Sequence, residues 1–260
     1  MSLRYLVAAI CILATQQSHA QKIVAWNLPA GTNVAQPSLS RTPDGELVLS
    51  WIQRLPEGGH RLNMSLYSQK SGWSQTSTIA SGKNFFVNWA DFPATQVLSD
   101  GSIWAHNLEK NGDGTYSYDV ILRRSKDKGK SWSSAFRVNA AAQAEHGFVS
   151  LWPWSKSQLC VAWLDGGTNA MPDAKHDAHG HGAGMMSMRV AVVEPVLQKS
   201  REWPIDLSTC DCCQTDATLT SRGPVVVYRD RTEKEIRDIY TTRFNGKKWT
   251  TPARVHADNW

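Results

Sequence analysis

The segment from Ser125 to Trp132 constrains the fold of this chain more than any other stretch. It reads Ser-Lys-Asp-Lys-Gly-Lys-Ser-Trp and follows an apolar, β-rich run. Asp127 can accept hydrogen bonds from turn amides, and the serine before the tryptophan can brace the turn. Gly129 can adopt a positive φ, and Trp132 offers a large apolar ring to pack beneath the turn. The segment therefore predicts a tight turn that joins two strands.

The ending of this segment recurs along the chain, each time before a short strand-like run. The recurring tryptophans are Trp73, Trp132, Trp203 and Trp249, at spacings of 59, 71 and 46 residues. Two hairpin-turn dipeptides also lie 56 residues apart, Asp44-Gly45 and Asp100-Gly101. A period of this length, with several short strands per unit, is typical of the blades of a β-propeller.

We therefore predict an all-β propeller with four visible blades. Their expected ranges are 30–85, 86–140, 145–207 and 210–256, and an insertion near 165–185 lengthens the third blade. Tryptophan is abundant in the chain, with 12 residues, as expected when each blade motif contains one.

The first 20 residues have the composition of a secretory signal peptide. Arg4 supplies the positive start, a short apolar core follows, and Ser18 and Ala20 are the small residues that a signal peptidase reads. We expect an exported protein, periplasmic or secreted, with no membrane span. The net charge of +5 is scattered, and its densest run, 123–130, coincides with the predicted turn. A nucleic-acid partner is therefore not expected.

Four cysteines follow the predicted leader, and three of them fall within four residues at Cys210, Cys212 and Cys213. Disulfides are the ordinary expectation in an exported protein. Adjacent cysteines rarely pair with each other, however, and Cys160 lies in an apolar, strand-like run. Thiolate ligands for a metal ion remain the alternative.

The segments that precede the innermost strands of a propeller gather at one mouth of its central channel. Here those segments carry Asp91, Glu145-His146 and the cysteine cluster. If they converge there, these groups would suit a site for copper or zinc, with disulfides or inert thiols as the alternative. The insertion adds His176, His179 and His181 with nearby methionines, and imidazole and thioether are copper ligands. A polar loop without ligands, or a substrate lid, is the alternative reading of the insertion.

These features together resemble the sialidase-like family of β-propellers, whose BNR repeats carry the Ser125–Trp132 pattern as an Asp box. The chain is similar in particular to an exported bacterial subgroup with a Cys-Asp-Cys-Cys motif. The segments that carry this resemblance are 88–93, 163–166, 210–215, 227–231 and 235–239. Propellers of this family usually have six blades. The resemblance thus implies a C-terminally truncated chain, with 21–260 as a partial propeller domain that lacks further blades of the same polypeptide. A complete four-bladed propeller is the alternative.

The resemblance also implies a set of catalytic residues. Sialidases hold the substrate carboxylate with three arginines and use a Tyr-Glu nucleophile pair with an acidic proton donor. Arg237, next to Glu235, is the candidate for one of these arginines, and Asp91 is the candidate proton donor. The first arginine of the family is absent, because the matching place reads Val34-Ala-Gln-Pro37.

Two functional hypotheses follow. The first is a divergent or non-catalytic exported propeller that binds a ligand or a metal ion at the channel mouth. The second is a glycoside hydrolase of exo-α-sialidase type that acts on acidic sugars. Whether the protein is an enzyme is left open by the sequence.

Overall fold

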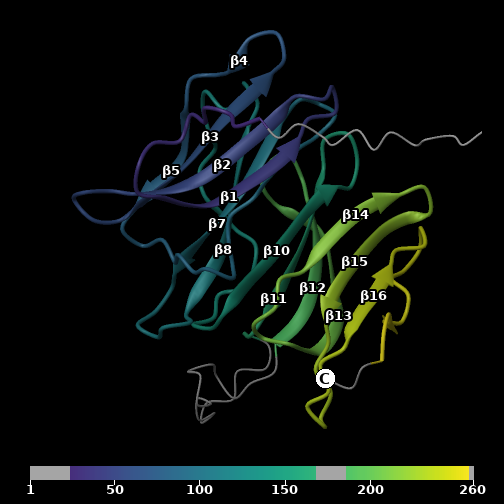
Figure 1. The fold of residues 1–260 in the computed structure, drawn as a ribbon. Coiled ribbons are helices and arrows are strands. Elements are labelled where there is room, and N and C mark those ends of the chain that lie inside the picture. The colour runs from purple at the N-terminus through teal and green to yellow at the C-terminus, as the bar shows by residue number, and fades with distance from the viewer. Residues whose placement is uncertain (1–23, 168–185, 258–260) are drawn as a thin grey trace, which may run out of the picture.

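The computed structural model describes residues 24–167 and 186–257. These residues form 17 β-strands in four antiparallel sheets and contain no helix, so none that could cross a membrane. Each sheet is a meander of consecutive strands, and the sheets follow one another around an arc from the first to the last (Figure 1). The chain is thus an all-β propeller with four blades among the described residues, as predicted.

The first two blades comprise the strands up to residue 137. Blade one contains β1 (Val34–Arg41), β2 (Leu47–Arg54), β3 (His60–Ser68), β4 (Gly72–Trp73) and β5 (Ser77–Gly82). Both β4 and β5 pair with β3, so this sheet has five strands. Blade two contains β6 (Thr95–Val97), β7 (Ile103–Lys110), β8 (Tyr118–Ser125) and β9 (Phe136–Arg137).

The last two blades have four strands each. Blade three contains β10 (His146–Pro153), β11 (Leu159–Asp165), β12 (Met186–Val193) and β13 (Lys199–Thr209). Blade four contains β14 (Asp216–Thr220), β15 (Gly223–Arg229), β16 (Ile239–Arg243) and β17 (Ala253–Arg254). The strands of blades one, two and four fall inside the predicted ranges, and those of blade three extend two residues beyond the predicted end.

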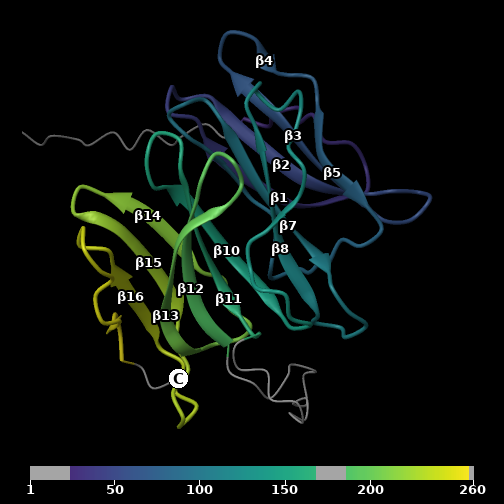
Figure 2. The ribbon, with the colours of Figure 1, turned by 180° about the vertical axis from the view of Figure 1, so that it is seen from behind.

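The first strand of each blade is the innermost. β6 contacts both β1 and β10, and β10 contacts β14, so these four strands lie next to one another across the blades. Figure 2 shows the same succession of sheets from behind. The segments that lead into β6, β10 and β14 therefore meet on one side of the arc.

The turn predicted at Ser125–Trp132 joins β8 to β9. The Asp127 carboxylate accepts hydrogen bonds from the Ser131 amide at 2.9 Å and from the Ser125 hydroxyl at 2.8 Å. Gly129 has a φ of 84°. The Trp132 ring packs against the apolar cluster between blades one and two. The turn thus connects two strands of one blade and also fixes that blade to its neighbour.

The hydrophobic core consists of layers between successive blades. In β11 the side chains alternate between two of these layers, because Leu159, Val161 and Trp163 pack toward blade two and the residues between them pack toward blade four. A strand that is buried on both faces reads as a continuous apolar run, as β11 does from Leu159 to Leu164. Cys160 belongs to the layer that faces blade four and is fully buried there.

Two inner strands contain the same irregularity near their first residues. In β1 the pairing with β2 shifts by one residue between Ala35 and Ser38, and in β10 the pairing with β11 shifts between Gly147 and Ser150. Each bulge contains a non-glycine residue with a positive φ, 52° at Gln36 and 54° at Phe148. These bulges turn the chain at the point where it enters the channel wall.

The structure also locates parts of the chain about which the sequence was ambiguous. Met186 and Met188, which the sequence pattern grouped with the histidine-rich insertion, lie in β12 and are buried in the core. Their alternation with Val190 is that of a strand, and they are therefore not loop ligands. The predicted signal peptide, 1–20, lies outside the described residues.

Candidate functional site

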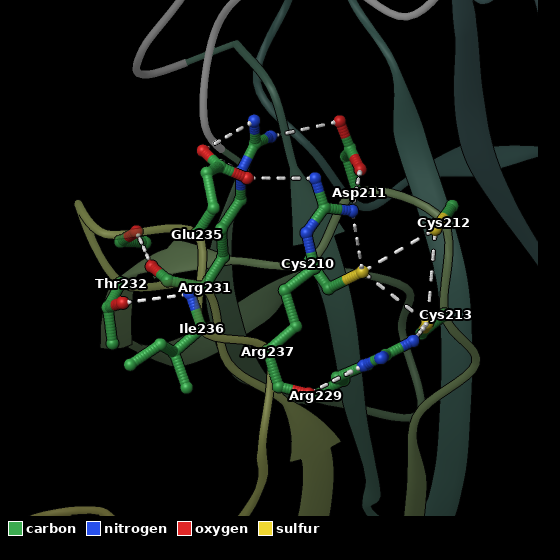
Figure 3. A network of polar contacts seen from close by, with 11 residues as sticks. Cys210, Asp211, Cys212, Cys213, Arg229, Arg231, Thr232, Glu235, Ile236 and Arg237 are labelled. Carbon is green, nitrogen blue, oxygen red and sulfur yellow. Dashed lines mark hydrogen bonds and ion pairs between the residues drawn. The ribbon is translucent and has the colours of Figure 1, made fainter. Parts of the chain in front are cut away.

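Three thiols form a compact cluster between blades three and four. The Sγ atom of Cys210 lies 3.5 Å from that of Cys212 and 3.4 Å from that of Cys213. The Sγ atoms of Cys212 and Cys213 are 3.9 Å apart. Among the described residues, these three are the candidate metal ligands whose donor atoms lie within 4.8 Å of one another. The close-up in Figure 3 shows the three sulfur atoms facing one another.

The backbone around the cysteines explains why their side chains converge. β13 ends at Thr209, and the next amide, of Cys210, donates a hydrogen bond to the Arg229 carbonyl at 2.9 Å. The chain then turns, and the Thr215 hydroxyl donates to the Phe148 carbonyl at 2.7 Å. Because the segment is tied to β15 at one end and to β10 at the other, its turn is compact. Cys210 is buried, Cys213 is half-buried and Cys212 is exposed.

Two arginines contact the sulfur atoms. An Nη1 of Arg229 lies 3.4 Å from the Cys213 Sγ, and an Nη1 of Arg237 lies 3.8 Å from the Cys210 Sγ. Hydrogen bonds from Cys210 and Cys212, with the nearby Arg229 charge, hold the pKa of the Cys213 thiol well below its usual range. The cluster therefore lies beside two guanidinium groups, whose positive charge favours a thiolate over a thiol.

A second layer of ion pairs surrounds these arginines (Figure 3). Arg237 pairs with Glu235 at 3.0 Å and approaches Asp211 at 3.9 Å. Arg231 bridges the same two carboxylates at 3.1 and 3.3 Å. Hydrogen bonds from Arg231 and Arg237 lower the pKa of Glu235. Arg237 is thus fixed in place by carboxylates while one side of its guanidinium faces the thiols.

An open groove of about 460 Å³ lies next to the thiols. Its walls include the Cys213 thiol, Arg229 and Arg237, and its remaining lining residues are Gln214, Asp238, Ile239 and His256. The groove therefore gives a ligand access to one thiol and to two guanidinium groups at once.

The buried Asp91, the half-buried Glu145 and a tyrosine form a separate cluster near the segments before β6 and β10. The Tyr118 hydroxyl lies 2.9 Å from Glu145 Oε1 and 3.3 Å from Asp91 Oδ2. Burial raises the pKa of Asp91 to about 7, although hydrogen bonds from the Phe148 amide and Tyr118 oppose this rise. Burial also raises the pKa of Glu145 to about 8, and the negative charges of Asp211 and Asp91 add to the effect.

The effect of Asp211 on Glu145 links this acid cluster to the thiol cluster. Asp211 lies between two of the cysteines in the sequence and is also the partner of Arg231 and Arg237. The segments before β10 and β14 therefore lie side by side at the mouth of the channel.

His146 lies apart from the thiols. Its ring is fully buried, with Nδ1 2.9 Å from the Tyr118 carbonyl oxygen and Nε2 3.8 Å from an Asp165 oxygen. It is not among the donor atoms that group with the three cysteines. His176, His179 and His181 lie outside the described residues.

The structure therefore brings together Arg237, Glu235 and the three cysteines, and it places Asp91 in the neighbouring acid cluster. Sequence reasoning did not select Tyr118, Arg229 or Arg231. Arg229 and Arg231 are two positions apart at the end of β15, and this spacing in an extended chain places both side chains on the same side.

No family model matches the chain, and no curated protein sequence matches it. Solved structures do show the same fold at low sequence identity. A protein of unknown function from Dyadobacter fermentans is 14% identical with a TM-score of 0.56, over 85% of this chain and 69% of that one. An α-L-arabinofuranosidase from Fusarium graminearum, in complex with an iminosugar inhibitor, is 13% identical with a TM-score of 0.54, over 87% and 67%.

A sialidase from Streptococcus pneumoniae is 10% identical with a TM-score of 0.50. The match covers 86% of this chain and 52% of the sialidase, so the chain spans about half the length of that protein. These likenesses show the fold, which this chain shares with glycoside hydrolases and a sialidase.

Proposed function

We propose that this propeller binds a soft metal ion, copper(I) or zinc, through Cys210, Cys212 and Cys213 at the channel mouth. The observation that carries the proposal is the spacing of the three sulfur atoms. A triangle with edges of 3.4, 3.5 and 3.9 Å has a circumradius of about 2.1 Å, slightly less than a zinc–sulfur bond of about 2.3 Å. The three sulfurs would therefore hold one ion without a large change in their spacing.

The charges around the cluster support the same proposal. Three thiolates with one copper(I) or zinc ion carry a net negative charge, which costs free energy in a partly buried site unless it is compensated. Arg229 and Arg237 supply two positive charges at 3.4 and 3.8 Å from the sulfurs. Thiolate sulfur is the ligand type that selects copper(I) and zinc over magnesium or calcium.

Metal analysis of the untagged protein tests this proposal. The protein is reduced, loaded with zinc or copper(I) under anaerobic conditions, desalted and analysed for bound metal. About one equivalent is expected, and Cys210→Ser, Cys212→Ser and Cys213→Ser should each lower the affinity by about 10-fold or more. Cys160→Ser is the matched control, because that thiol is buried in the core away from the cluster. Equal metal binding in all four variants, or none in the reduced wild type, would reject the proposal.

A second candidate function, cleavage or binding of an acidic sugar, is favoured by a different observation. Asp91 and Glu145 share one tyrosine hydroxyl and have raised pKa values. A raised pKa keeps the proton donor of a glycosidase protonated. Arg237 now pairs with Glu235 at 3.0 Å and would exchange that partner for a substrate carboxylate. Turnover of a fluorogenic sialoside that is lost in Arg237→Ala and kept in Arg222→Ala, an exposed arginine, would support it. Absence of turnover by the complete protein would remove the catalytic form of this candidate.

A further inference from the structure

The three cysteines are not equivalent in their access to ligands. The Cys213 thiol forms part of the groove wall, together with Arg229 and Arg237. Cys210 is fully buried directly behind it, at the shortest of the three sulfur–sulfur distances, 3.4 Å. One thiol is therefore open to a ligand in the groove, and a second thiol is in position to react with whatever the first one has bound.

This arrangement has the parts that thiol–disulfide exchange needs. The attacking sulfur has to be accessible and to have its negative charge stabilised, and a second thiol has to lie close enough to displace the mixed disulfide. The Arg229 guanidinium, 3.4 Å from the Cys213 Sγ, provides that stabilisation. Cys210 and Cys213 also have the Cys-x-x-Cys spacing found in dithiol redox proteins.

The groove further indicates the class of disulfide. Two guanidinium groups beside the reacting sulfur favour a substrate that carries carboxylates, because their positive charge attracts an anion to the groove. The volume of about 460 Å³ and the open form of the groove suit a small molecule or the end of a peptide.

We propose that Cys213 and Cys210 exchange with small disulfides that bear carboxylate groups, oxidised glutathione being the chemical type. The Cys213 sulfur, as thiolate, bonds to one sulfur of the substrate, and the other sulfur leaves as a thiolate that takes a proton from water. Cys210 then loses its proton and its sulfur displaces the second substrate thiol from Cys213. The external disulfide is reduced to two thiols, and the dithiol of the protein is oxidised to a Cys210–Cys213 disulfide.

The exchange uses the metal-free cysteines and does not require the proposed metal site to be correct. If both proposals hold, a bound ion occupies the same sulfurs and protects them from oxidation. The two can therefore fail separately, because metal binding is measured on the reduced protein without any disulfide, and exchange is measured after a chelator has removed metal.

The test follows the reaction of the reduced, metal-free full chain with oxidised glutathione. Trapping with an alkylating reagent and peptide mass spectrometry should show a transient glutathione adduct on Cys213, followed by a Cys210–Cys213 disulfide. In Cys210→Ser the adduct on Cys213 should accumulate, and in Cys213→Ser the adduct should not form at that position. The Cys160→Ser control should behave as the wild type. These assignments come from peptide masses, so they also apply to a variant whose overall stability is reduced.

Substrate charge provides the second arm of the test. Oxidised glutathione should react about 10-fold faster than the neutral hydroxyethyl disulfide and faster still than the cationic cystamine. Arg229→Gln and Arg237→Gln should reduce this preference, whereas Arg222→Gln should leave it unchanged. Circular dichroism of each variant checks that its fold is retained. The proposal is overturned if the mapped disulfide joins other cysteines, if the thiols stay reduced, or if the three disulfides react at equal rates.

Discussion

Asp91 offers the sharpest test of the physical reasoning, because its carboxyl group is buried and its hydrogen bonds do not offset the cost of burying a charge. The side chain is 1% exposed, its Oδ1 atom has no hydrogen-bond partner among the described residues, and its pKa is raised to about 7 from 3.8. Between these two pH values the folded protein holds a proton that the unfolded chain has released. The stability contributed by the protonated form is therefore complete below pH 4 and is lost as the pH rises to 7.

The size of the loss follows from the pKa difference. Each pH unit corresponds to about 1.4 kcal/mol, so the full shift amounts to on the order of 4 kcal/mol. Asp91→Asn keeps the shape and an acceptor oxygen but cannot ionise. Its unfolding free energy relative to the wild type should therefore rise by about 3 kcal/mol between pH 5 and pH 8. Any packing cost of the amide does not depend on pH and cancels in this difference.

Urea unfolding at pH 5, 6, 7 and 8, followed by tryptophan fluorescence and circular dichroism, measures this difference. Coincident transitions from the two probes justify a two-state treatment. Asp127→Asn gives a control whose difference from the wild type should be flat over this pH range, because hydrogen bonds from Ser131 and Ser125 lower the pKa of Asp127 to about 2. That variant should lose stability above pH 4 and differ less from the wild type below it. If the difference between Asp91→Asn and the wild type is flat across pH 5 to 8, the reasoning about burial is refuted.

Two further substitutions near the same residue have defined outcomes. Gly147→Ala would place a Cβ atom 1.9 Å from Asp91 Oδ2 and should lower the free energy of unfolding by about 1–3 kcal/mol. Gly31→Ala is the control, because its Cβ meets nothing within 4 Å, and it should change that free energy by less than about 0.5 kcal/mol. Equal urea midpoints for the two variants would contradict this.

Tyr118→Phe removes a hydrogen bond that lowers the pKa of Asp91 and of Glu145. Both pKa values should rise, and stability should fall more steeply between pH 7 and pH 9 than in the wild type; an unchanged profile would show that the hydroxyl has no such role.

The parts of the fold that the sequence predicted correctly depend on local chemistry. The dipeptides Asp44-Gly45 and Asp100-Gly101 do form hairpin turns, with φ values of 95° and 80° at the glycines. The Ser125–Trp132 turn likewise depends on residues within one short segment. The cysteine cluster could also be predicted, since its three thiols are neighbours in the chain.

The acid cluster could not be predicted in the same way. Asp91, Tyr118 and Glu145 are separated by 27 residues at each step and come together only when blades two and three pack. Tyr118 looks like an ordinary buried strand residue in the sequence, and nothing local shows that its hydroxyl meets two carboxyl groups. His146 is a similar case, because its burial follows from the way β10 enters the channel wall and not from its own side chain.

The bulges at the start of β1 and β10 have a consequence for counting positions along these strands. In both strands two residues face a single tryptophan of the next strand, Trp51 in β2 and Trp163 in β11. The inward and outward alternation of side chains therefore changes phase by one residue at each bulge. A mutagenesis library designed by counting every second residue from the far end of the strand would be out of phase beyond the bulge. At the mouth it would change side chains that point away from the channel. Such work has to count outward from Gln36 and Phe148.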